Sequence, residues 1–488
     1  MKQYRMYVNG EWITPESGGY FKTINPYTLE EWAEIPSASS QDIEYAINSA
    51  REAFDSNWSR TSGKTRSELM FKFADLVEEN AENLAEIETR DNGKLYSETK
   101  KQLMFTSRAY RYFGGFADKI SGEVLPLDNN STFDFTLREP IGVAVLITSW
   151  NSPMQLLSNK LAPAIAAGNC VVIKPSEHAS ASTLELMKLV EKAGFPKGVI
   201  NVVTGFGDVG EQLTSSDKVN KVSFTGGQKA AKSIGRSTAE NFIPLTLELG
   251  GKSPNIIFAD ADIDRAVNGA MAGIFASSGQ TCIAGSRLFV QDEVYERVCS
   301  KLKQKVDEIV LGDPMDKDTN MGPIANRPQY ESIIDALDAS TDEGAELLSG
   351  GVKKSGGRSL FIEPTILINV TNSMKVAQNE VFGPILSIIR FSTEEEVIEQ
   401  ANDSDYGLAS GIWTESMDRI LRISKALDAG TVWVNTYRST AVQAPFGGVK
   451  KSGYGRERGL HALAEYTRVK NVMIDYSGET RDPFSIKV

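Results

Sequence analysis

The run IGVAVLITSW (141–150) decides the fold, because it predicts a strand that is apolar on both faces. Three more short β-branched runs follow it, CVVIKP (170–175), GVINVVTG (198–205) and KVSFTGG (221–227). Helical patterns such as SASTLELMKLVEKAG (180–194) separate these runs. Strands that alternate with helices predict a parallel sheet with helices on both sides. The fold class is therefore α/β, with a Rossmann-type, dinucleotide-binding domain.

The flanking segments extend this domain on both sides. YVNGEW (7–12) predicts a tight hairpin, since Asn9-Gly10 suits a type I′ turn, and amphipathic helices are expected from about 40 to 113. Residues 121–140 form a polar, extended stretch that is expected to leave the compact body. A second α/β series from SPNIIFADADIDRAV (253–267) to GTVWVNTY (430–437) predicts a second domain.

Composition excludes several classes of protein. The 488 residues carry 64 acids and 52 bases, and a net charge of -12 argues against a nucleic-acid or anionic-membrane partner. No run of about 18 apolar residues predicts a membrane span, and the first residues lack the apolar core of a signal peptide. Three cysteines without CxxC spacing predict neither a disulfide framework nor a cysteine zinc site. We expect no metal and a reducing, cytoplasmic location.

One cysteine has an unusual setting. SSGQTCIAGSR (277–287) surrounds Cys282 with small residues, between Gly279 and Gly285. A reactive thiol needs access to substrate, whereas a structural thiol is usually wrapped in bulky apolar side chains. A buried structural role stays open for Cys282 and is preferred for Cys170 and Cys299.

A carboxylate precedes that cysteine by one helical pattern. In PLTLELGGKSP (244–254), Glu248 ends a predicted strand and two glycines follow it. Ligands approach the carboxyl ends of parallel strands, so Glu248 and Cys282 are expected to converge on one cavity. The alternative is a half-buried strand whose Glu248 meets solvent.

Three turns resemble phosphate-binding loops. KPSE (174–177), GFGDVG (205–210) and FTGG (224–227) each follow a predicted strand. Each is weak alone, but helix N-termini attract pyrophosphate, so three such turns at neighbouring strands favour a nucleotide site.

Nine blocks in order resemble the NAD(P)-dependent aldehyde dehydrogenase superfamily. They are TSWNSP (148–153), KPSE, GFGDVG, FTGG, LELGGKSP (247–254), GQTCIAGSR (279–287), NEVFGPI (379–385), WVNTY (433–437) and PFGGVKKSGYGRE (445–457). The resemblance covers nearly the whole chain. It implies oxidation of an aldehyde to the free acid through a hemithioacetal and a thioester.

The resemblance also implies catalytic roles. Cys282 matches the nucleophile, Asn151 the side-chain donor of the oxyanion hole, and Glu248 the base that activates water against the thioester. Relatives that transfer the acyl group to coenzyme A generally lack this acid. Lys160 and Glu457 match residues that relay protons, with a surface ion pair as the alternative.

Cofactor contacts are implied in the same way. The resemblance assigns the adenine ribose to Lys174 and Glu177, the phosphates to the turn glycines and Thr225, and the nicotinamide ribose to Glu380 and Phe382. The full set of expected cofactor residues is Trp150, Lys174, Ser176, Glu177, Gly207, Gly210, Thr225, Gly226, Gly227, Leu249, Glu380 and Phe382. Gly227 stands where many members carry serine. Since Glu177 repels a 2′-phosphate, NAD is preferred and NADP is the alternative.

The expected substrate tunnel is polar. Positions that are aromatic in many members that oxidise apolar aldehydes hold Ser152 and Asn159 here, with Gln155 between them. Arg438 matches a position at the tunnel mouth and suits a substrate carboxylate; the alternative is that it pairs with a nearby acid or is simply solvated. We therefore expect a polar aldehyde that is acidic or hydroxylated.

Three rival functions stay open at this stage. They are a cysteine hydrolase without nicotinamide, a non-catalytic binding protein, and acyl transfer to coenzyme A. The expected domains are an NAD-binding domain (1–120 and 141–247), a catalytic domain (248–450) and a small β element (121–140 and 467–488). That element resembles the bridging hairpin and added strand of the family, so a homodimer or a dimer of dimers is expected.

Overall fold

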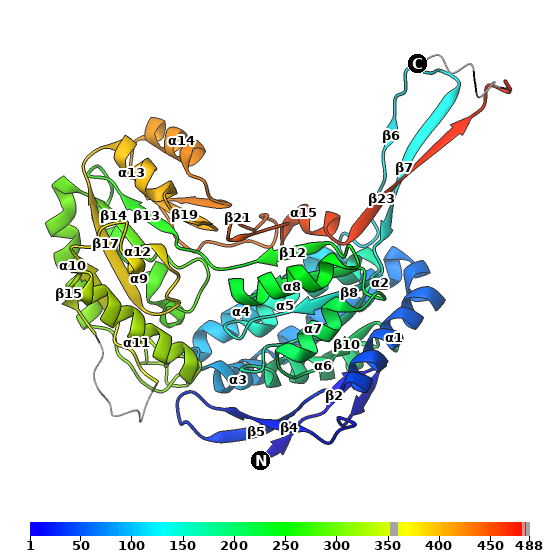
Figure 1. Ribbon diagram of the computed structural model, residues 1–488, viewed down its shortest axis with the longest axis horizontal. Helices are drawn as coiled ribbons and strands as arrows, with labels where there is room; N and C mark the ends of the chain where they lie inside the picture. The colour runs from blue at the N-terminus through cyan, green and yellow to red at the C-terminus, as the bar shows by residue number, and fades with distance from the viewer. Residues whose placement is uncertain (352–359, 481–483, 485–488) are drawn as a thin grey trace.

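A computed structural model describes residues 1–351, 360–480 and 484 of the chain. Two sheets organise the body, and a narrow β arm projects from it (Figure 1). The first sheet has eight strands in the order β22-β12-β11-β8-β9-β10-β2-β3. Its strands are β2 (Met6–Val8), β3 (Glu11–Ile13), β8 (Val143–Ile147), β9 (Cys170–Lys174), β10 (Ile200–Val202), β11 (Lys221–Thr225), β12 (Leu245–Glu248) and β22 (Gly453–Tyr454).

The five central strands of this sheet are parallel, as the alternating sequence pattern predicts. Their order, β10-β9-β8-β11-β12, runs outward in both directions from β8, the first of them along the chain. The connection therefore reverses direction between β8 and β11. A crevice opens at such a point beyond the carboxyl ends of the strands, and dinucleotides bind there.

Helices cover both faces of the first sheet, and every residue of β8, β9 and β11 is buried. A capping box of Ser39 and Asp42 starts the first helix. The helices of this part are α1 (Ser40–Ser56), α2 (Gly63–Glu79), α3 (Ala81–Asn92), α4 (Tyr96–Gly114), α5 (Pro153–Ala167), α6 (Ala181–Ala193), α7 (Gly207–Ser215) and α8 (Gln228–Ala239), with a 3₁₀ turn η1 (Trp58–Arg60). The helices expected between 40 and 113 are confirmed.

The second sheet has seven strands and its own apolar cores. Its order is β15 (Glu346–Ser349), β16 (Thr365–Ile368), β17 (Ile385–Phe391), β14 (Arg287–Gln291), β13 (Pro254–Ile257), β19 (Ala409–Trp413) and β20 (Thr431–Val434). All neighbours are parallel except β15 and β16. Around it lie α9 (Ile263–Ile274), α10 (Tyr295–Asp307), α11 (Arg327–Asp342), α12 (Lys375–Gln378), α13 (Glu394–Asn402), α14 (Met417–Ala426) and the 3₁₀ turns η2 (Ala276–Gly279) and η3 (Asp292–Val294).

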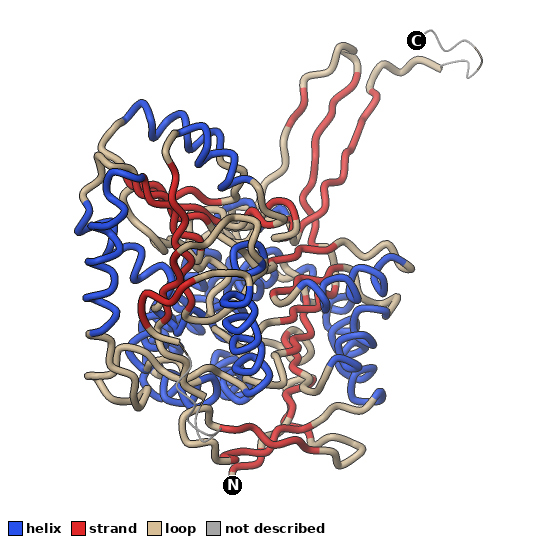
Figure 2. Tube along the Cα trace, turned by 60° about the vertical axis from the view of Figure 1, so that its left-hand side comes forward, coloured by secondary structure: helices blue, strands red, loops and turns tan. Residues whose placement is uncertain are grey.

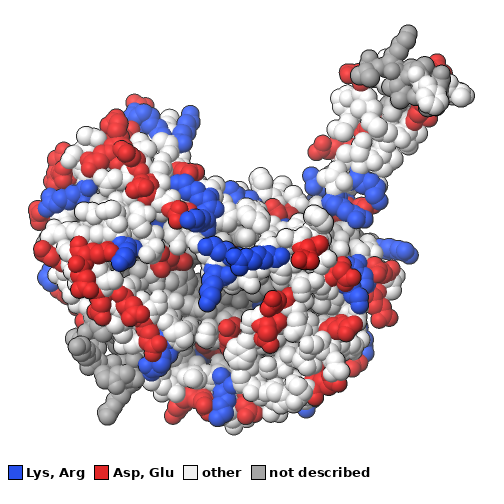
Figure 3. Space-filling view, viewed as in Figure 1, with Lys and Arg blue, Asp and Glu red and all other residues white. Residues whose placement is uncertain are grey.

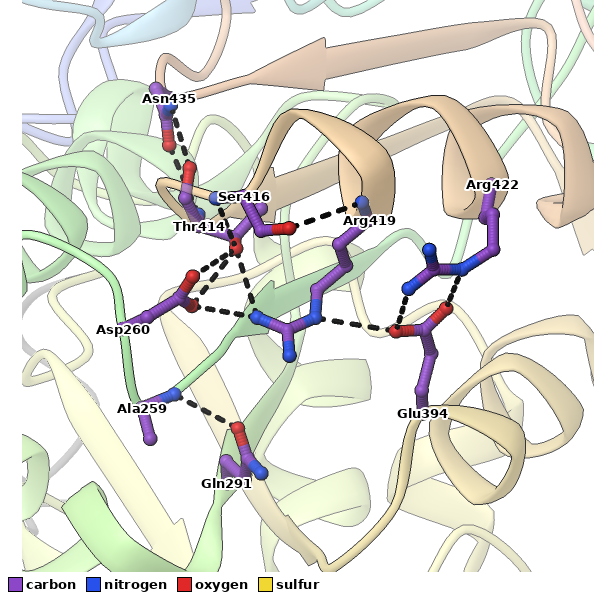
Figure 4. Close-up of polar contacts among 9 residues, drawn as sticks. All are labelled: Ala259, Asp260, Gln291, Glu394, Thr414, Ser416, Arg419, Arg422 and Asn435. Carbon is purple, nitrogen blue, oxygen red and sulfur yellow. Dashed lines mark hydrogen bonds and ion pairs between the residues drawn. The ribbon is translucent and has the colours of Figure 1, made fainter.

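Arg419 fastens α14 to this second sheet (Figure 4). Its Nη1 donates to Asp260 Oδ1 at 2.8 Å, and its Nε donates to Glu394 Oε2 at 3.3 Å. The guanidinium also lies 4.3 Å from the ring centroid of Phe258. The two carboxylates come from the end of β13 and from α13, so one side chain ties three elements together.

The arm is a three-stranded sheet of β6 (Val124–Leu125), β7 (Thr132–Pro140) and β23 (Thr467–Asp475). It extends away from the body in both views (Figures 1 and 2), as expected for 121–140. Its surface is largely uncharged (Figure 3), and its exposed apolar residues include Phe133, Leu137, Val469 and Met473. Residues 481–483 and 485–488 of the expected β element lie outside the described residues.

Smaller elements complete the body. Asn9 (φ 54°) and Gly10 (φ 72°) form the predicted hairpin between β2 and β3. The others are β1 (Lys2–Gln3), β4 (Tyr20–Ile24), β5 (Glu31–Pro36), β18 (Tyr406–Gly407), β21 (Val449–Lys450) and α15 (Gly459–Ala464). In the part of the chain that the structure describes, no helix is both long and apolar enough to span a bilayer.

Candidate active site

A cavity of about 450 Å³ opens where the strand order reverses. Residues that follow β8 line it on one side, and residues that follow β11 line it on the other. The expected cofactor residues on its wall are Trp150, Lys174, Ser176, Glu177, Gly207, Gly210, Thr225, Gly226 and Gly227. The three phosphate-type turns do not follow three adjacent strands, however, since β8 lies between β9 and β11. The prediction was wrong in this detail, because strand order is not chain order.

The wall of this cavity suits a pyrophosphate. No side chain caps the N-terminus of α8 at Gly227, and a Cβ added there or at Gly207 would meet nothing within 4 Å. The buried Thr225 Oγ1 has no hydrogen-bond partner within residues 1–351, 360–480 and 484. Free N–H groups at a helix start, open space above them and an unpaired hydroxyl fit a dinucleotide's phosphates.

Lys174 and Glu177 lie at one end of the cavity. Lys174 Nζ is 3.9 Å from Glu177 Oε2, and burial lowers the pKa of the lysine. Ser176 Oγ accepts from the His178 N–H at 3.3 Å. His178, which sequence reasoning did not select, also lines this wall.

A smaller cavity of about 230 Å³ joins this site to the reactive residues. The rings of Trp150 and Phe382 meet edge to face across it, with centroids 5.3 Å apart. Glu380 Oε1 accepts from the Gly251 N–H at 3.2 Å, and burial raises the pKa of Glu380 to about 7. Leu249 also lines this junction.

Cys282 lies at the inner end of the junction, in the loop before β14. Helix α9 ends before this loop, at Ile274, and Ser277 and Ser278 then take left-handed conformations. Cys282 is partly exposed, whereas Cys170 and Cys299 are buried. Burial and the charges of Glu380 and Glu248 raise the pKa of the Cys282 thiol to about 12.

Glu248 faces the same junction from the end of β12. It is 3% exposed, and neither carboxylate oxygen has a hydrogen-bond partner among the described residues. Burial and the charge of Glu457 raise its pKa well above the usual value. The solvent-facing alternative is therefore wrong.

Asn151 stands beside Cys282 at the start of α5. Its Nδ2 donates to the Gln280 carbonyl at 3.0 Å, and its Oδ1 accepts from Ser149 Oγ at 2.6 Å. These two bonds fix the amide with its nitrogen toward the cysteine loop.

Lys160 and Glu457 form a buried pair behind Glu248. Lys160 Nζ lies 2.5 Å from Glu457 Oε1 and donates also to Ser223 Oγ at 3.1 Å. The alternative of a surface ion pair is wrong, since the exposures are 0% and 4%.

A third cavity of about 500 Å³ holds the other face of Cys282. Ser152, Gln155, Asn159 and Arg438 all line it, as expected. Arg438 Nη1 donates to the carbonyls of Ala272 and Ala276 at 3.2 and 3.1 Å. These two bonds hold its guanidinium at the C-terminal end of α9.

Three cations of this cavity were not selected from the sequence, namely Lys94, Lys101 and Arg458. Lys94 Nζ donates to Ser152 Oγ at 2.5 Å, and Arg458 Nε donates to Asn159 Oδ1 at 3.3 Å. A signal for Arg458 was present, since GRERG (455–459) concentrates charge between glycines next to Glu457. The segment DNGK (91–94) indicates only a turn, and nothing in it shows that Lys94 contacts the distant Ser152.

Comparison with known proteins agrees with this geometry. The sequence model of the aldehyde dehydrogenase family matches residues 12–472. A (Z)-2-((N-methylformamido)methylene)-5-hydroxybutyrolactone dehydrogenase of Acinetobacter baylyi is 43% identical, over 100% of both chains. Human retinal dehydrogenase 2 is 42% identical, over 97% of this chain and 92% of its own.

Solved structures give the same result. The NAD⁺ complex of an aldehyde dehydrogenase from Bacillus cereus superposes with a TM-score of 0.95 at 40% identity, over 97% of both chains. Betaine aldehyde dehydrogenase of Staphylococcus aureus, also with NAD⁺, gives 0.96 at 38% identity, over 99% of this chain and 96% of its own. The chain therefore belongs to the aldehyde dehydrogenase family and is an oxidoreductase that converts an aldehyde to the carboxylic acid with NAD(P).

Proposed function

We propose that Cys282 is the nucleophile of this reaction, with Asn151 and Glu248 acting on it from opposite sides. The observation that carries the proposal is the junction cavity, whose wall contains all three residues and which adjoins both the dinucleotide cavity and the substrate cavity. No other cysteine has such access, since Cys170 and Cys299 are buried.

Activation of the thiol is the first step. With a pKa near 12, Cys282 is protonated at neutral pH and must lose its proton before attack. The Glu248 carboxylate can accept that proton, because its pKa is raised and neither oxygen has a hydrogen-bond partner among the described residues. The thiolate then bonds to the carbonyl carbon, and the Asn151 amide donates to the resulting oxyanion.

Oxidation and hydrolysis complete the cycle. NAD bound in the first cavity supplies the hydride acceptor. Loss of hydride re-forms the carbonyl as a thioester on Cys282, and Glu248 must then release the proton that it took from the thiol. The free carboxylate takes a proton from the water that attacks the thioester, and collapse of that adduct releases the acid and the Cys282 thiolate. Lys160 and Glu457, next to Glu248, provide a route by which that proton leaves.

NAD is the proposed cofactor in preference to NADP. The wall that holds Lys174 carries the carboxylate of Glu177 only 3.9 Å away. A phosphate on the ribose would face that negative charge, while ribose hydroxyls would donate to it.

A polar aldehyde, acidic or hydroxylated, is the proposed substrate. Ser152, Gln155 and Asn159 present hydroxyl and amide groups to the cavity rather than aromatic rings. The name of the Acinetobacter relative contains a 5-hydroxybutyrolactone, and a butyrolactone with a hydroxyl on C5 is the ring-closed form of a 4-oxo acid.

The arm is the proposed contact between copies of the chain. Its exposed apolar strands need a cover, which favours a homodimer or a dimer of dimers. We also propose the domain limits given above, with the first sheet in the NAD-binding domain, the second in the catalytic domain and the arm as the oligomerisation element. Three free cysteines support a reducing, cytoplasmic location.

The experiment is a mixing assay of the full chain with an aldehyde and NAD, without coenzyme A. We expect absorbance of the reduced nicotinamide and an equal amount of free acid from the native protein, and neither from Cys282→Ala. Product that forms only after addition of coenzyme A would support acyl transfer instead. Acid release without nicotinamide would support a cysteine hydrolase, and turnover by Cys282→Ala would refute the proposed nucleophile.

A further inference from the structure

Arg458 has an unusual backbone. It precedes α15 with φ 59° and ψ 170°, a region that residues other than glycine rarely adopt. Such strain persists where the surroundings over-determine it, and it concentrates at functional sites. The strained residue follows Glu457 directly and lines the cavity that contains Cys282.

Two aromatic rings hold the Arg458 side chain. Its guanidinium carbon lies 4.9 Å from the ring centroid of Phe105 and 4.9 Å from that of Phe446. Two cation–π contacts restrict the movement of the guanidinium. The side chain is therefore pre-organised, although the residue is only 8% exposed.

Among the described residues, the charges of Glu457 and Glu248 favour the Arg458 cation, but neither carboxylate forms an ion pair with it. Among the described residues, its one hydrogen bond runs from Nε to Asn159 Oδ1, at 3.3 Å, and it forms no ion pair. The adjacent carboxylate of Glu457 is taken by Lys160. Burying an unpaired guanidinium is costly, so the terminal nitrogens are expected to serve an anion that is not part of the chain.

A second donor adjoins it. Asn159 is 2% exposed, and its buried Nδ2 has no hydrogen-bond partner in the part of the chain that the structure describes. Because its Oδ1 faces Arg458, the amide hydrogens and the terminal guanidinium N–H groups lie on neighbouring atoms of one wall.

Two other cations of the cavity, Arg438 and Lys94, are already engaged, and Lys101 is exposed to solvent. Arg438 donates to carbonyls at the end of α9, and Lys94 donates to Ser152 and Gln102. Among the acids, Glu98 accepts from the Ser277 N–H. Arg458 is thus the cavity cation with the most donors left for a substrate.

We propose that Arg458 binds a carboxylate carried by the aldehyde substrate, with Asn159 Nδ2 as a second donor, and so determines specificity for short oxo acids. A planar guanidinium matches the two oxygens of a carboxylate. This inference rests on the proposed function, since it assumes that the aldehyde reacts at Cys282. It assigns to Arg458 the role that Arg438 had in the sequence-based expectation.

The test compares two substrates that differ in one charge, succinic semialdehyde and its methyl ester, with NAD. We expect kcat/KM of the native protein to be at least about tenfold higher for the acid. In Arg458→Gln the acid-to-ester ratio is expected to fall by about 100-fold, mainly through KM. Arg458→Lys should retain an intermediate ratio, because the charge stays and the fork is lost.

Control variants distinguish direct contact with the carboxylate from a general electrostatic effect of the cavity and from misfolding. Lys101→Gln removes an exposed cation at the same cavity, and its acid-to-ester ratio should stay within about threefold of the native ratio. Glycine fits the left-handed backbone at this position, so Arg458→Gly should fold. This variant should lose the preference for the acid over the ester. Added ethylguanidinium should restore part of that preference.

A binding measurement gives a readout without turnover. Succinate should bind Cys282→Ala, and its Kd should rise by about 30-fold when Arg458→Gln is added. An unchanged acid-to-ester ratio in Arg458→Gln, or a preference of the native protein for a phosphorylated aldehyde, would overturn the assignment while leaving the proposed function intact. If no aldehyde yields reduced nicotinamide, the proposed function fails, and this inference with it.

Discussion

Lys160 Nζ lies 2.5 Å from Glu457 Oε1, and neither side chain is more than 4% exposed. Both charges shift the pKa of Glu248, since Glu457 raises it and Lys160 lowers it. Burial raises the pKa of this proposed base most, and the charges of the buried pair adjust it further.

Removing either charge should move the pH profile in opposite directions. Glu457→Gln lowers the pKa of Glu248, because a negative neighbour disappears, and the acid limb of kcat/KM moves to lower pH. Lys160→Met removes a positive neighbour, so the same limb moves to higher pH. Profiles of kcat/KM against pH check both shifts.

The double variant Lys160→Met/Glu457→Gln is the control. Each single variant leaves one buried charge unpaired, which costs about 3 to 5 kcal/mol of stability, whereas the double variant removes both. Its profile should lie between those of the single variants, and equal shifts in the same direction would contradict the coupling.

Glu248→Gln should separate the two chemical stages. The amide cannot take a proton from water, so we expect steady-state turnover to fall about 10²- to 10⁴-fold while the thioester accumulates. At high pH, Cys282 can form its thiolate without Glu248. Under these conditions, stopped-flow absorbance should show up to one equivalent of reduced nicotinamide per site. Mass spectrometry should find the acyl group on Cys282, and full turnover would refute the role.

Asn151→Ala should slow the chemical steps. Loss of one oxyanion donor typically costs about 10²- to 10³-fold in kcat. Ser149→Ala offers a matched comparison, since it removes only the 2.6 Å bond that orients the amide, and a smaller loss is expected. A loss confined to KM in Asn151→Ala would indicate substrate binding instead.

Local sequence pattern was sufficient for much of the fold. The β-branched run 141–150 and its successors became the buried parallel strands β8 to β11, and Asn9-Gly10 formed its hairpin. The order of those strands could not be read from the chain, because pairing depends on long-range packing. The placement of β8 between β9 and β11 therefore appeared only in the structure.

The residues of the site also differ in how far the sequence alone could identify them. Cys282, Glu248 and Asn151 lie in distinctive local motifs, so sequence could select them, and the structure brings them to one cavity. The charge cluster GRERG (455–459) marks Arg458 only weakly, since its importance lies in rings and an amide contributed by residues as distant as Phe105 and Asn159. Arg438 looked equivalent in sequence, yet the carbonyls at the end of α9 occupy it.

Arg419 offers a test of the contacts that hold the second sheet. Arg419→Ala removes two ion pairs and a cation–π contact from a side chain that is 25% exposed, so we expect a loss of about 2 to 4 kcal/mol. Arg422→Ala loses only its pair with the same Glu394, is 59% exposed, and should cost less than about 1 kcal/mol. Urea unfolding followed by fluorescence checks the difference, and equal losses would contradict it.

Glu177→Gln should relax the choice of cofactor. The substitution keeps the hydrogen-bonding shape but removes the negative charge 3.9 Å from Lys174, so a ribose phosphate would then meet a net positive wall. A change of about 1.4 kcal/mol, or tenfold, in the NADP-to-NAD ratio of kcat/KM is expected from one charge in a partly solvated site. Glu211→Gln, an exposed acid on the same cavity, serves as control and should change the ratio much less. If both variants change it equally, the preference reflects the general field of the cavity; if native protein uses both cofactors equally well, Glu177 exerts no selection.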